Sequence, residues 1–328
     1  MSRIRRYCSL LLGVCIAILP LFLNNYWIDV ASNVGLYVLL ALSLNVILGQ
    51  TGIFHMGHSA FYAVGAYFTA ICNTYYQIPI LWLLPLAGFT TAFFALIIVR
   101  PILSLRGDYL LIVSIGIVEI VRIALTNDIC GITGGANGIF GISRPTIGDI
   151  VIRTTTQFYY LIWGIVLLTM LLFSWLFSSR YGRAFNSIKE DEVAAEGSGI
   201  NIIHYKWLAF VVGAFWAGIA GNLFASKMTV ISPTSFTIWE SVIIFVIVIL
   251  SGGSQLGVIL GTCFVIALPE IFRSLADARM LIFGLAMMIM MIVRPQGLLP
   301  PLPRVYNIRN LLHKKHSDFG SPIAPRQN

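Results

Sequence analysis

A glutamate and an arginine inside an apolar stretch are the first residues of this chain whose types suggest chemistry. Glu119 and Arg122 lie in the apolar run Tyr109–Leu125. A charge at the centre of a membrane-spanning helix costs about 2.5–3.5 kcal/mol on insertion scales, so such residues usually face protein or water. The three-residue spacing puts both on one helical face, where they can pair. Two interpretations stay open: the pair borders a path for a polar solute, or it is a structural ion pair.

Two histidines lie three residues apart near the start of another apolar run. His55 and His58 belong to the segment Gln50–Ser59, and one helical face can present both. A zinc site needs at least one more ligand, and no neighbouring segment offers one. We therefore predict no metal, and we expect His58 to make hydrogen bonds among the helices or to border a solute path.

A glycine-rich segment, Gly131–Ile139, lies in the long loop Thr126–Gln157. Glycines allow tight turns and expose backbone N–H groups, which can bind an anion such as a carboxylate. An ordinary turn is the alternative. The candidate residues here are Thr133, Gly134, Gly135, Asn137 and Gly138.

The segment Ser178–Lys206 holds the densest charge of the chain. Within it, Ala184, Ile188 and Ala195 have helical spacing, which predicts one helix from Arg183 to Glu196. Gly197 or Gly199 can end that helix. A short amphipathic helix of this kind fits a groove on a partner protein, although a solvated helix between two spans is an alternative.

Motifs of several enzyme classes are missing. The chain has no GxxxxGK[ST] segment, so it has no P-loop for ATP. It also has neither HExxH nor GxSxG. The five cysteines form no CxxC pair, which argues against a disulfide framework. We therefore predict a protein that is not an enzyme and holds no cofactor of its own.

The composition indicates what must position these residues. Of 328 residues, 58% are hydrophobic and only 10% are charged, and the mean hydropathy is +0.88. Soluble domains carry about 25% charged residues, so this chain needs an apolar surrounding. The net charge of +8 does not indicate a nucleic-acid partner, because the basic residues do not gather in patches with aromatic residues.

The fold class predicted from this pattern is all-α: a polytopic transmembrane helical bundle of about ten spans, with eight to eleven as the range. The ten apolar segments are Ser9–Leu23, Ile28–Leu48, Ile53–Cys72, Ile78–Val99, Tyr109–Leu125, Phe158–Phe177, Trp207–Ala225, Phe236–Leu250, Leu256–Phe272 and Met280–Val293. The count allows an inverted repeat of five plus five spans, but no internal sequence match supports one.

Charge placement predicts the orientation. With ten spans and both termini cytoplasmic, most of the 21 lysines and arginines fall on the cytoplasmic side. The basic residues predicted on the outside are Arg144, Arg153, Lys227, Arg273 and Arg279. We accordingly predict one membrane domain, residues 1–300, with loop 126–157 periplasmic and loop 178–206 cytoplasmic. Residues 301–328 are predicted to form a basic cytoplasmic tail.

Small residues recur at four-residue spacing in two rows. One row is Gly213, Ala217 and Gly221, and the other is Gly253, Gly257 and Gly261. In lipid, small residues let helix backbones approach closely. The rows predict a tightly packed bundle.

The order of several short motifs resembles the branched-chain amino acid permease family of ABC importers, in particular its LivM-like subunits. The resemblance extends over about 290 residues. It rests on Leu44-Asn45, residues 49–52, residues 57–67, residues 119–122, residues 133–138, Gly182-Arg-Ala, residues 190–195, residues 199–201, Gly252-Gly253, Gly257 and residues 294–298.

The resemblance implies a role for the polar segment and a set of partners. The segment would be the coupling helix that docks on an ATPase, and the residues assigned to it are Arg183, Glu190, Asp191, Glu192, Ala194, Ala195 and Gly199. The implied partners are a LivH-like permease, two cytoplasmic P-loop ATPases that bind ATP and magnesium, and a periplasmic binding protein. The implied location is the bacterial inner membrane, in contact with lipid.

Other functions stay open at this point. Permeases of the same fold import urea, short amides or sugars. A secondary transporter driven by protons or sodium would use Glu119 as its protonatable group. A membrane-embedded enzyme and an assembly protein are further alternatives.

Overall fold

The computed structural model describes residues 18–103, 107–128, 131–147 and 150–271, together with residues 13, 16, 284–285, 288, 292–293 and 297–299. The first half contains η1 (Leu19–Leu21), α2 (Asn25–Thr51), α3 (His58–Tyr76), α4 (Ile80–Ile102), α5 (Asp108–Thr126), η3 (Gly135–Asn137), β1 (Ile139–Phe140), β2 (Thr146–Ile147) and β3 (Ile150–Val151). The second half contains α6 (Thr155–Ser178), α7 (Arg180–Glu190), α8 (Glu192–Gly197), α9 (Ile202–Met228), β4 (Val230–Ile231), η4 (Pro233–Ser235), α10 (Ile238–Ser251), α11 (Gln255–Thr262), η5 (Cys263–Ala267) and α12 (Leu268–Ile271).

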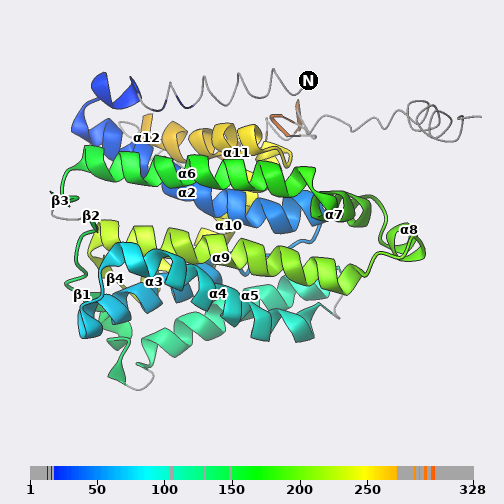
Figure 1. Cartoon of the computed structure of the whole chain (residues 1–328), viewed down its shortest axis with the longest axis horizontal. Coiled ribbons are helices and arrows are strands. Elements are labelled where there is room, and N and C mark those ends of the chain that lie inside the picture. Colours follow the sequence, from blue (N-terminus) through cyan, green and yellow to red (C-terminus); the bar gives the residue numbers. More distant parts are fainter. Residues whose placement is uncertain are drawn as a thin grey trace, which may run out of the picture.

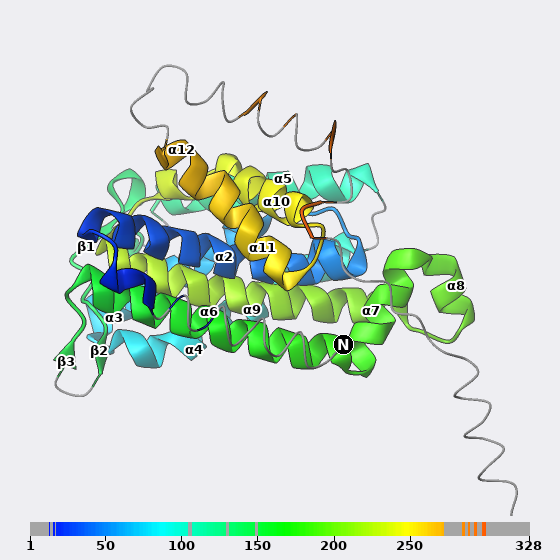
Figure 2. The same cartoon turned by 90° about the horizontal axis from the view of Figure 1, so that it is seen from above.

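The long helices lie roughly side by side along one axis (Figures 1 and 2). The short helices α7 and α8 lie at one end of this bundle, and the four strands lie at the opposite end. The strands pair antiparallel as β1 with β4 and as β2 with β3. The two long loops predicted to lie on opposite sides of the membrane therefore lie at opposite ends of the molecule.

Six helices in the described part of the chain are long and apolar enough to cross a membrane. The chain is thus an all-α, polytopic membrane protein. The predicted segments from Ile28–Leu48 to the one beginning at Leu256 all coincide with helices. The first segment, the tenth segment and the tail 301–328 fall largely or wholly outside the described residues. The count of ten and the cytoplasmic termini stay predictions.

The third predicted span begins later than its sequence suggested. The prediction started it at Ile53, but α3 begins only at His58. Gly52 ends α2 with a left-handed φ of +76°, a backbone conformation that glycine adopts without strain. Residues 52–57 are therefore not helical.

Helices α2 and α9 form the centre of the bundle. Both have 27 residues, which corresponds to about 40 Å at 1.5 Å per residue. They run antiparallel, because Lys227 of α9 contacts Asp29 near the start of α2, whereas Gly213 lies against Ile47 near its end. Most residues of both helices are buried. They fill the interior, while the other helices surround them.

The row Gly213, Ala217 and Gly221 lies on α9, as predicted, and it lets neighbouring backbones come close. A methyl group added at Gly221 would lie 2.5 Å from the backbone of Ala66 on α3. The prediction that the second row, Gly253, Gly257 and Gly261, lies on one helix is wrong. Gly253 precedes α11 and has a φ of +86°, so it forms part of the turn between α10 and α11.

Two parts of the chain repeat each other in opposite orientation. Helix α2 ends at the left-handed Gly52, and a short non-helical segment leads to the shorter α3. Helix α9 ends at the left-handed Thr229, and β4 and η4 lead to the shorter α10. The packing repeats as well, since α9 packs on α3 and α4, whereas α2 packs on α10 and α11. The units α2–α4 and α9–α11 thus share a similar arrangement in opposite orientation, which is typical of an inverted repeat and which no internal sequence match indicated.

Candidate functional site

The polar segment at one end of the bundle consists of two helices, so the prediction of one helix from Arg183 to Glu196 is wrong. The break is at Asp191, whose backbone is extended with φ −158° and ψ 114°. Its Oδ1 accepts hydrogen bonds from Val193 N at 2.8 Å and Ala194 N at 3.1 Å. Aspartate is a favoured N-cap because its side chain satisfies the free N–H groups of a first helical turn. The Asp-Glu-Val sequence therefore carried a helix-start signal that the periodicity argument overlooked.

The apolar face of the segment was predicted correctly. Ala184, Ile188 and Ala195 are all buried, although they belong to two helices rather than one. The outer face is exposed: Glu190 and Ala194 are exposed, and Val193 is 79% exposed. Val193, together with the nearby acidic residues Glu190 and Glu192, forms a small exposed surface at the tip of the molecule that is partly apolar and partly acidic.

Gly197 and Gly199 were both predicted as possible ends of the helix. In the structure, Gly199 is the glycine that turns the chain after α8. Gly199 has a φ of +82°. The N–H of Ile200 donates to the carbonyl of Ala195 at 3.1 Å, and the N–H of Gly199 donates to Glu196 O at 2.9 Å. This pattern is a Schellman-type helix end, which turns the chain sharply into α9.

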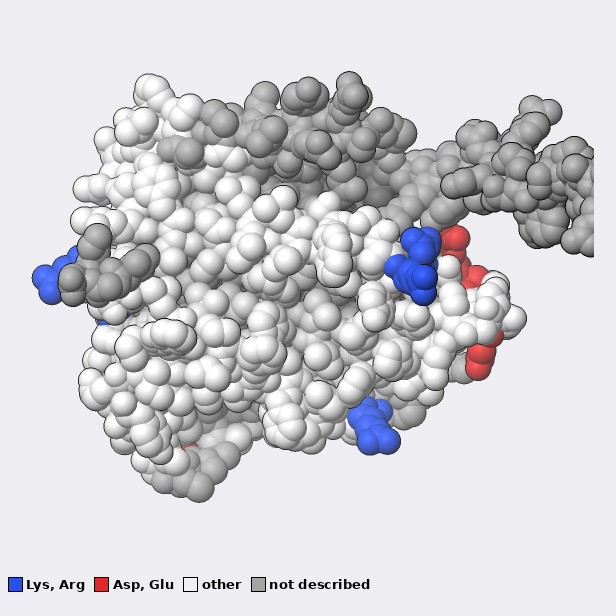
Figure 3. Space-filling view, viewed as in Figure 1, with Lys and Arg blue, Asp and Glu red and all other residues white. Residues whose placement is uncertain are grey.

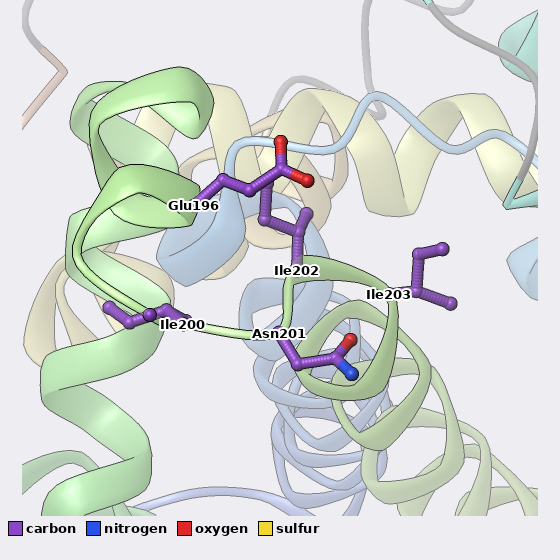
Figure 4. Close-up of a pocket in the computed structure, with 6 residues that line it drawn as sticks. Glu196, Ile200, Asn201, Ile202 and Ile203 are labelled. Carbon is purple, nitrogen blue, oxygen red and sulfur yellow. The ribbon is translucent and has the colours of Figure 1, made fainter.

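A shallow depression of about 380 Å³ lies between α8 and the start of α9. Figure 4 shows Glu196 on the α8 side, and Asn201 and Ile203 at the start of α9. An ion pair of 2.6 Å between Lys206 and Glu192 also connects α9 to α8. The two helices thus project from the bundle but are held at a fixed angle to α9.

Sequence reasoning assigned no role to Lys189, which connects this segment to the core. Lys189 Nζ donates to Gly49 O at 2.7 Å, in the last turn of α2. A cation at a helix C-terminus is favourable, because the free carbonyls there carry partial negative charge. Burial lowers the pKa of the Lys189 ammonium group from its ordinary value. The hydrogen bond nevertheless joins α7 directly to the end of α2.

The end of α2 is in turn bonded to the turn between α10 and α11. Asn45 Nδ2 and Gln50 Nε2 both donate to the carbonyl of Gly253, at 3.2 and 3.1 Å. A methyl group added at Gly253 would lie 3.3 Å from Gly49 O. Four elements, α7, α2, α10 and α11, therefore meet within a few ångströms of one glycine pair.

Charged residues gather toward the two ends of the face shown in Figure 3, and its middle carries none. Arg183 is exposed on α7, while Arg144 and Arg153 are exposed at the strand end. This distribution fits a membrane around the middle of the bundle.

The predicted pair on α5 forms. Arg122 Nη2 lies 2.6 Å from Glu119 Oε2, and each side chain is 33% exposed. Helix α5 packs only along one side, against α3, η3, η4 and α10, within the part of the chain that the structure describes. An ion pair that is partly exposed at this depth would be costly in lipid, so this flank of α5 is expected to face protein or water.

The backbone N–H groups of the glycine-rich loop bind a carboxylate that belongs to the same loop, that of Asp128. Asp128 Oδ1 accepts hydrogen bonds from Thr133 N at 2.8 Å and Gly134 N at 3.0 Å. Thr133 Oγ1 also donates to Leu125 O at 3.0 Å, at the end of α5. Gly134, Gly135 and Gly138 all have left-handed φ values, while Asn137 is exposed. The loop thus fastens the end of α5, and the strand that follows it pairs with β4.

The two histidines do not share a helical face as predicted, because His55 precedes α3. His58 is fully buried, and its Nε2 lies 2.6 Å from Ser43 Oγ. No group of three or more His, Cys, Asp or Glu side chains suited to a metal occurs among the residues that the structure describes.

Comparison with known proteins gives consistent results over most of the chain. A family model described as branched-chain amino acid transport system / permease component matches residues 26–293. The chain is 38% identical over 305 residues to the high-affinity branched-chain amino acid transport system permease protein LivM of Salmonella typhimurium, covering 86% of this chain and 72% of that protein. LivM of Escherichia coli K12 is 37% identical with the same coverage.

A second type of permease is also similar. The high-affinity branched-chain amino acid transport system permease protein LivH of S. typhimurium is 28% identical over 219 residues, which cover 60% of this chain and 68% of that protein. No solved structure matches the chain.

Proposed function

Because the chain belongs to the family of branched-chain amino acid transport permeases, we propose that it is the membrane-spanning subunit of an ATP-driven importer for leucine, isoleucine and valine. The observation that carries this proposal is the similarity to LivM over 86% of the chain. The protein then works as a transport subunit, and ATP and magnesium bind to separate ATPase subunits.

The segment α7–α8 is the proposed docking site for an ATPase. It projects at one end of the bundle and presents Glu190, Val193 and Ala194 to solvent. Arg183, Asp191 and Glu192 flank this surface, while Gly199 shapes the turn that holds it. Its hydrogen bond through Lys189 to α2 provides a route by which a movement of the ATPase reaches the core.

A second permease subunit of the LivH type is the proposed partner in the membrane. The similarity to LivH supports it, and so does the flank of α5 with Glu119 and Arg122. Whether this flank faces the partner or a solute path between the two subunits, the charges avoid lipid in either case. A periplasmic binding protein would deliver the amino acid at the strand end, near Thr133–Gly138. The proposed location is the bacterial inner membrane.

Purification of the tagged chain in mild detergent, followed by reconstitution with the proteins that accompany it, tests the proposal. We expect two P-loop ATPases to co-purify and ATP-dependent leucine uptake to follow. Co-purified ATPases without uptake of leucine, isoleucine or valine would point to urea, an amide or another solute. Uptake that follows a proton gradient without an ATPase would contradict the proposal and make Glu119 the central residue.

A further inference from the structure

Two connecting segments enter the bundle from opposite ends and meet inside it. Residues 52–57 follow α2, and residues 232–237, which include the 3₁₀ helix η4, follow β4 after α9. His58, the first residue of α3, lies beside Ser43, which is eight residues, or about 12 Å, before the end of α2. Glu240 in the first turn of α10 bonds Tyr37 of α2, about 21 Å before that end. Both α3 and α10 therefore begin near the middle of the membrane-spanning region.

The N-termini of these two helices are joined directly. Ser59 N donates to Ser241 Oγ at 2.9 Å, and Ser59 Oγ donates to Thr237 O at 3.0 Å. We call these three residues the α3–α10 junction. Neither helix has a side-chain N-cap of its own. The hydroxyl of Ser241 thus takes the position at the α3 N-terminus that an anion would otherwise occupy.

Two buried histidine nitrogens at the start of α3 have no hydrogen-bond partner among the residues described. They are His58 Nδ1 and His55 Nε2, and both side chains are more than nine-tenths buried. The His55 ring lies against the N-cap of α3, since a methyl group on Gly57 would lie 2.6 Å from His55 Cε1. Buried polar atoms are almost always paired, so unpaired ones at a helix N-terminus indicate a ligand or a second conformation.

A carboxylate without a cation lies next to the junction. Glu240 is partly buried and accepts a hydrogen bond from Tyr37 OH at 2.7 Å. It forms no ion pair within the described ranges. A carboxylate at this depth in a membrane protein usually marks a polar pathway and has a cationic partner.

We propose that the α3–α10 junction is the place where the permease binds the charged end of its amino acid during transport. When α3 and α10 separate, Ser59 N in the first turn of α3 binds the carboxylate in place of Ser241 Oγ. Glu240 binds the ammonium group. Half-helices whose N-termini face an anionic group near the membrane midplane, at the boundary of inverted repeats, are a known arrangement for this purpose in other transporter classes. The inference rests on the proposed function, because it takes a zwitterionic amino acid as the solute.

An engineered disulfide between α3 and α10, which can be formed and reduced, tests whether the junction opens. In a chain from which the five native cysteines have been removed, Ser59→Cys and Ser241→Cys are combined and oxidised to a disulfide in the reconstituted complex. We expect ATP-dependent leucine uptake by the double variant to stop on oxidation and to return on reduction, while oxidation does not change the uptake of either single variant. Uptake that continues with the disulfide formed would overturn the proposal. Absence of uptake in the cysteine-free parent before any lock would instead count against the proposed function.

Thiol labelling tests the ligand. Ser241→Cys is treated with a membrane-impermeant, sulfonate-bearing thiol reagent in the presence and absence of ATP, and Ser32→Cys is the matched control. Ser32 is equally buried, but its hydroxyl bonds within its own helix, to Ile28 O. We expect labelling at position 241 in one nucleotide state only, with protection by leucine and none by leucinamide, which lacks the carboxylate. Equal protection by both compounds, or no labelling in any state, would overturn the assignment.

Discussion

Lys189 is a single residue at which a movement of the docking helices can reach the core. Its ammonium group bonds Gly49 O, and the same turn of α2 bonds the carbonyl of Gly253 through Asn45 and Gln50. A movement of α7 reaches α2 only if the hydrogen bond between Lys189 and Gly49 is kept in both conformations of the permease. If α7 and α8 dock on an ATPase as proposed, we therefore expect Lys189 to transmit the movement rather than to bind the ATPase.

Replacing Lys189 with methionine should separate ATP hydrolysis from transport. A hydrogen bond to a charged group is worth about 1.5–3 kcal/mol, so we expect roughly a tenfold loss of leucine imported per ATP hydrolysed. Lys189→Arg should restore most of the ratio, because a guanidinium can also donate to Gly49 O. Both quantities are measured in the same proteoliposomes.

The matched control is Arg180→Met, which removes a positive charge from the first residue of the same helix. Arg180 is exposed, so its replacement should leave the contact between α7 and α2 in place. If this variant lost as much coupling as Lys189→Met, general loss of charge would explain both results and the transmission argument would fail.

A second residue-scale prediction concerns the docking surface. Ala194 is exposed whereas Ala195 is buried at 3% exposure. A large residue at position 195 would disrupt α8 itself, so Ala194→Arg is the cleaner probe. We expect it to abolish co-purification of the ATPase while the permease stays folded, as judged by gel filtration in detergent. Ser178→Arg, at an exposed serine outside α7 and α8, should leave the ATPase bound.

At the scale of the element, the break between α7 and α8 sets the direction of the docking surface. Asp191 stabilises this break by capping the first turn of α8. Replacing an aspartate N-cap with alanine costs roughly 0.5–2 kcal/mol of helix stability. Asp191→Ala should therefore loosen α8, and faster proteolysis between α7 and α9 would detect this. Asp191→Asn, which keeps the cap, should resist proteolysis as the parent does.

The elements show what could and could not be predicted from the sequence. Long apolar runs located α2, α4, α5, α6 and α9, because a membrane span has a length requirement that composition alone reveals. The late start of α3 at His58 was missed, since Ile53, Phe54 and Met56 continue the apolar run and only the two glycines that flank them, Gly52 and Gly57, signal the break. The contact between Lys189 and Gly49 joins positions 140 residues apart, and no local pattern encodes such a pair. Glu119 and Arg122 were predicted because three-residue spacing is a local property.

At the scale of the whole molecule, glycines decide how closely the helices pack. A methyl group added at Gly218 would lie 2.6 Å from Ala87 O on α4, and one added at Gly65 would meet Gly218 Cα at 2.5 Å. At these glycines helix α9 therefore comes close enough to α3 and α4 for backbone atoms of neighbouring helices to be in contact. Lipid-exposed bundles depend on such contacts, because helices gain no hydrophobic energy from each other in the membrane.

Gly218→Val should destabilise the bundle. Overpacking of this kind costs typically about 1–3 kcal/mol, and the affected atoms include Ala87 O, a backbone atom that cannot move aside. We expect a lower midpoint of thermal unfolding in detergent. Gly116→Val is the control, since a methyl group there meets nothing within 4 Å. Equal midpoints for the two variants would contradict this account of the packing.

The inverted repeat has an energetic consequence. The two units have a similar build and opposite orientations. The conformation open to one side of the membrane can therefore use the same kinds of contact as the conformation open to the other side, so these two conformations differ little in free energy. A bias of about 5.5 kcal/mol moves a two-state population from 1:99 to 99:1. If the two conformations are nearly equal in free energy, a difference of this size in how strongly they favour nucleotide binding is enough to move the membrane domain from one to the other. A preference for one resting conformation must then come from places where the two units differ, such as the 19 residues of α3 against the 14 of α10.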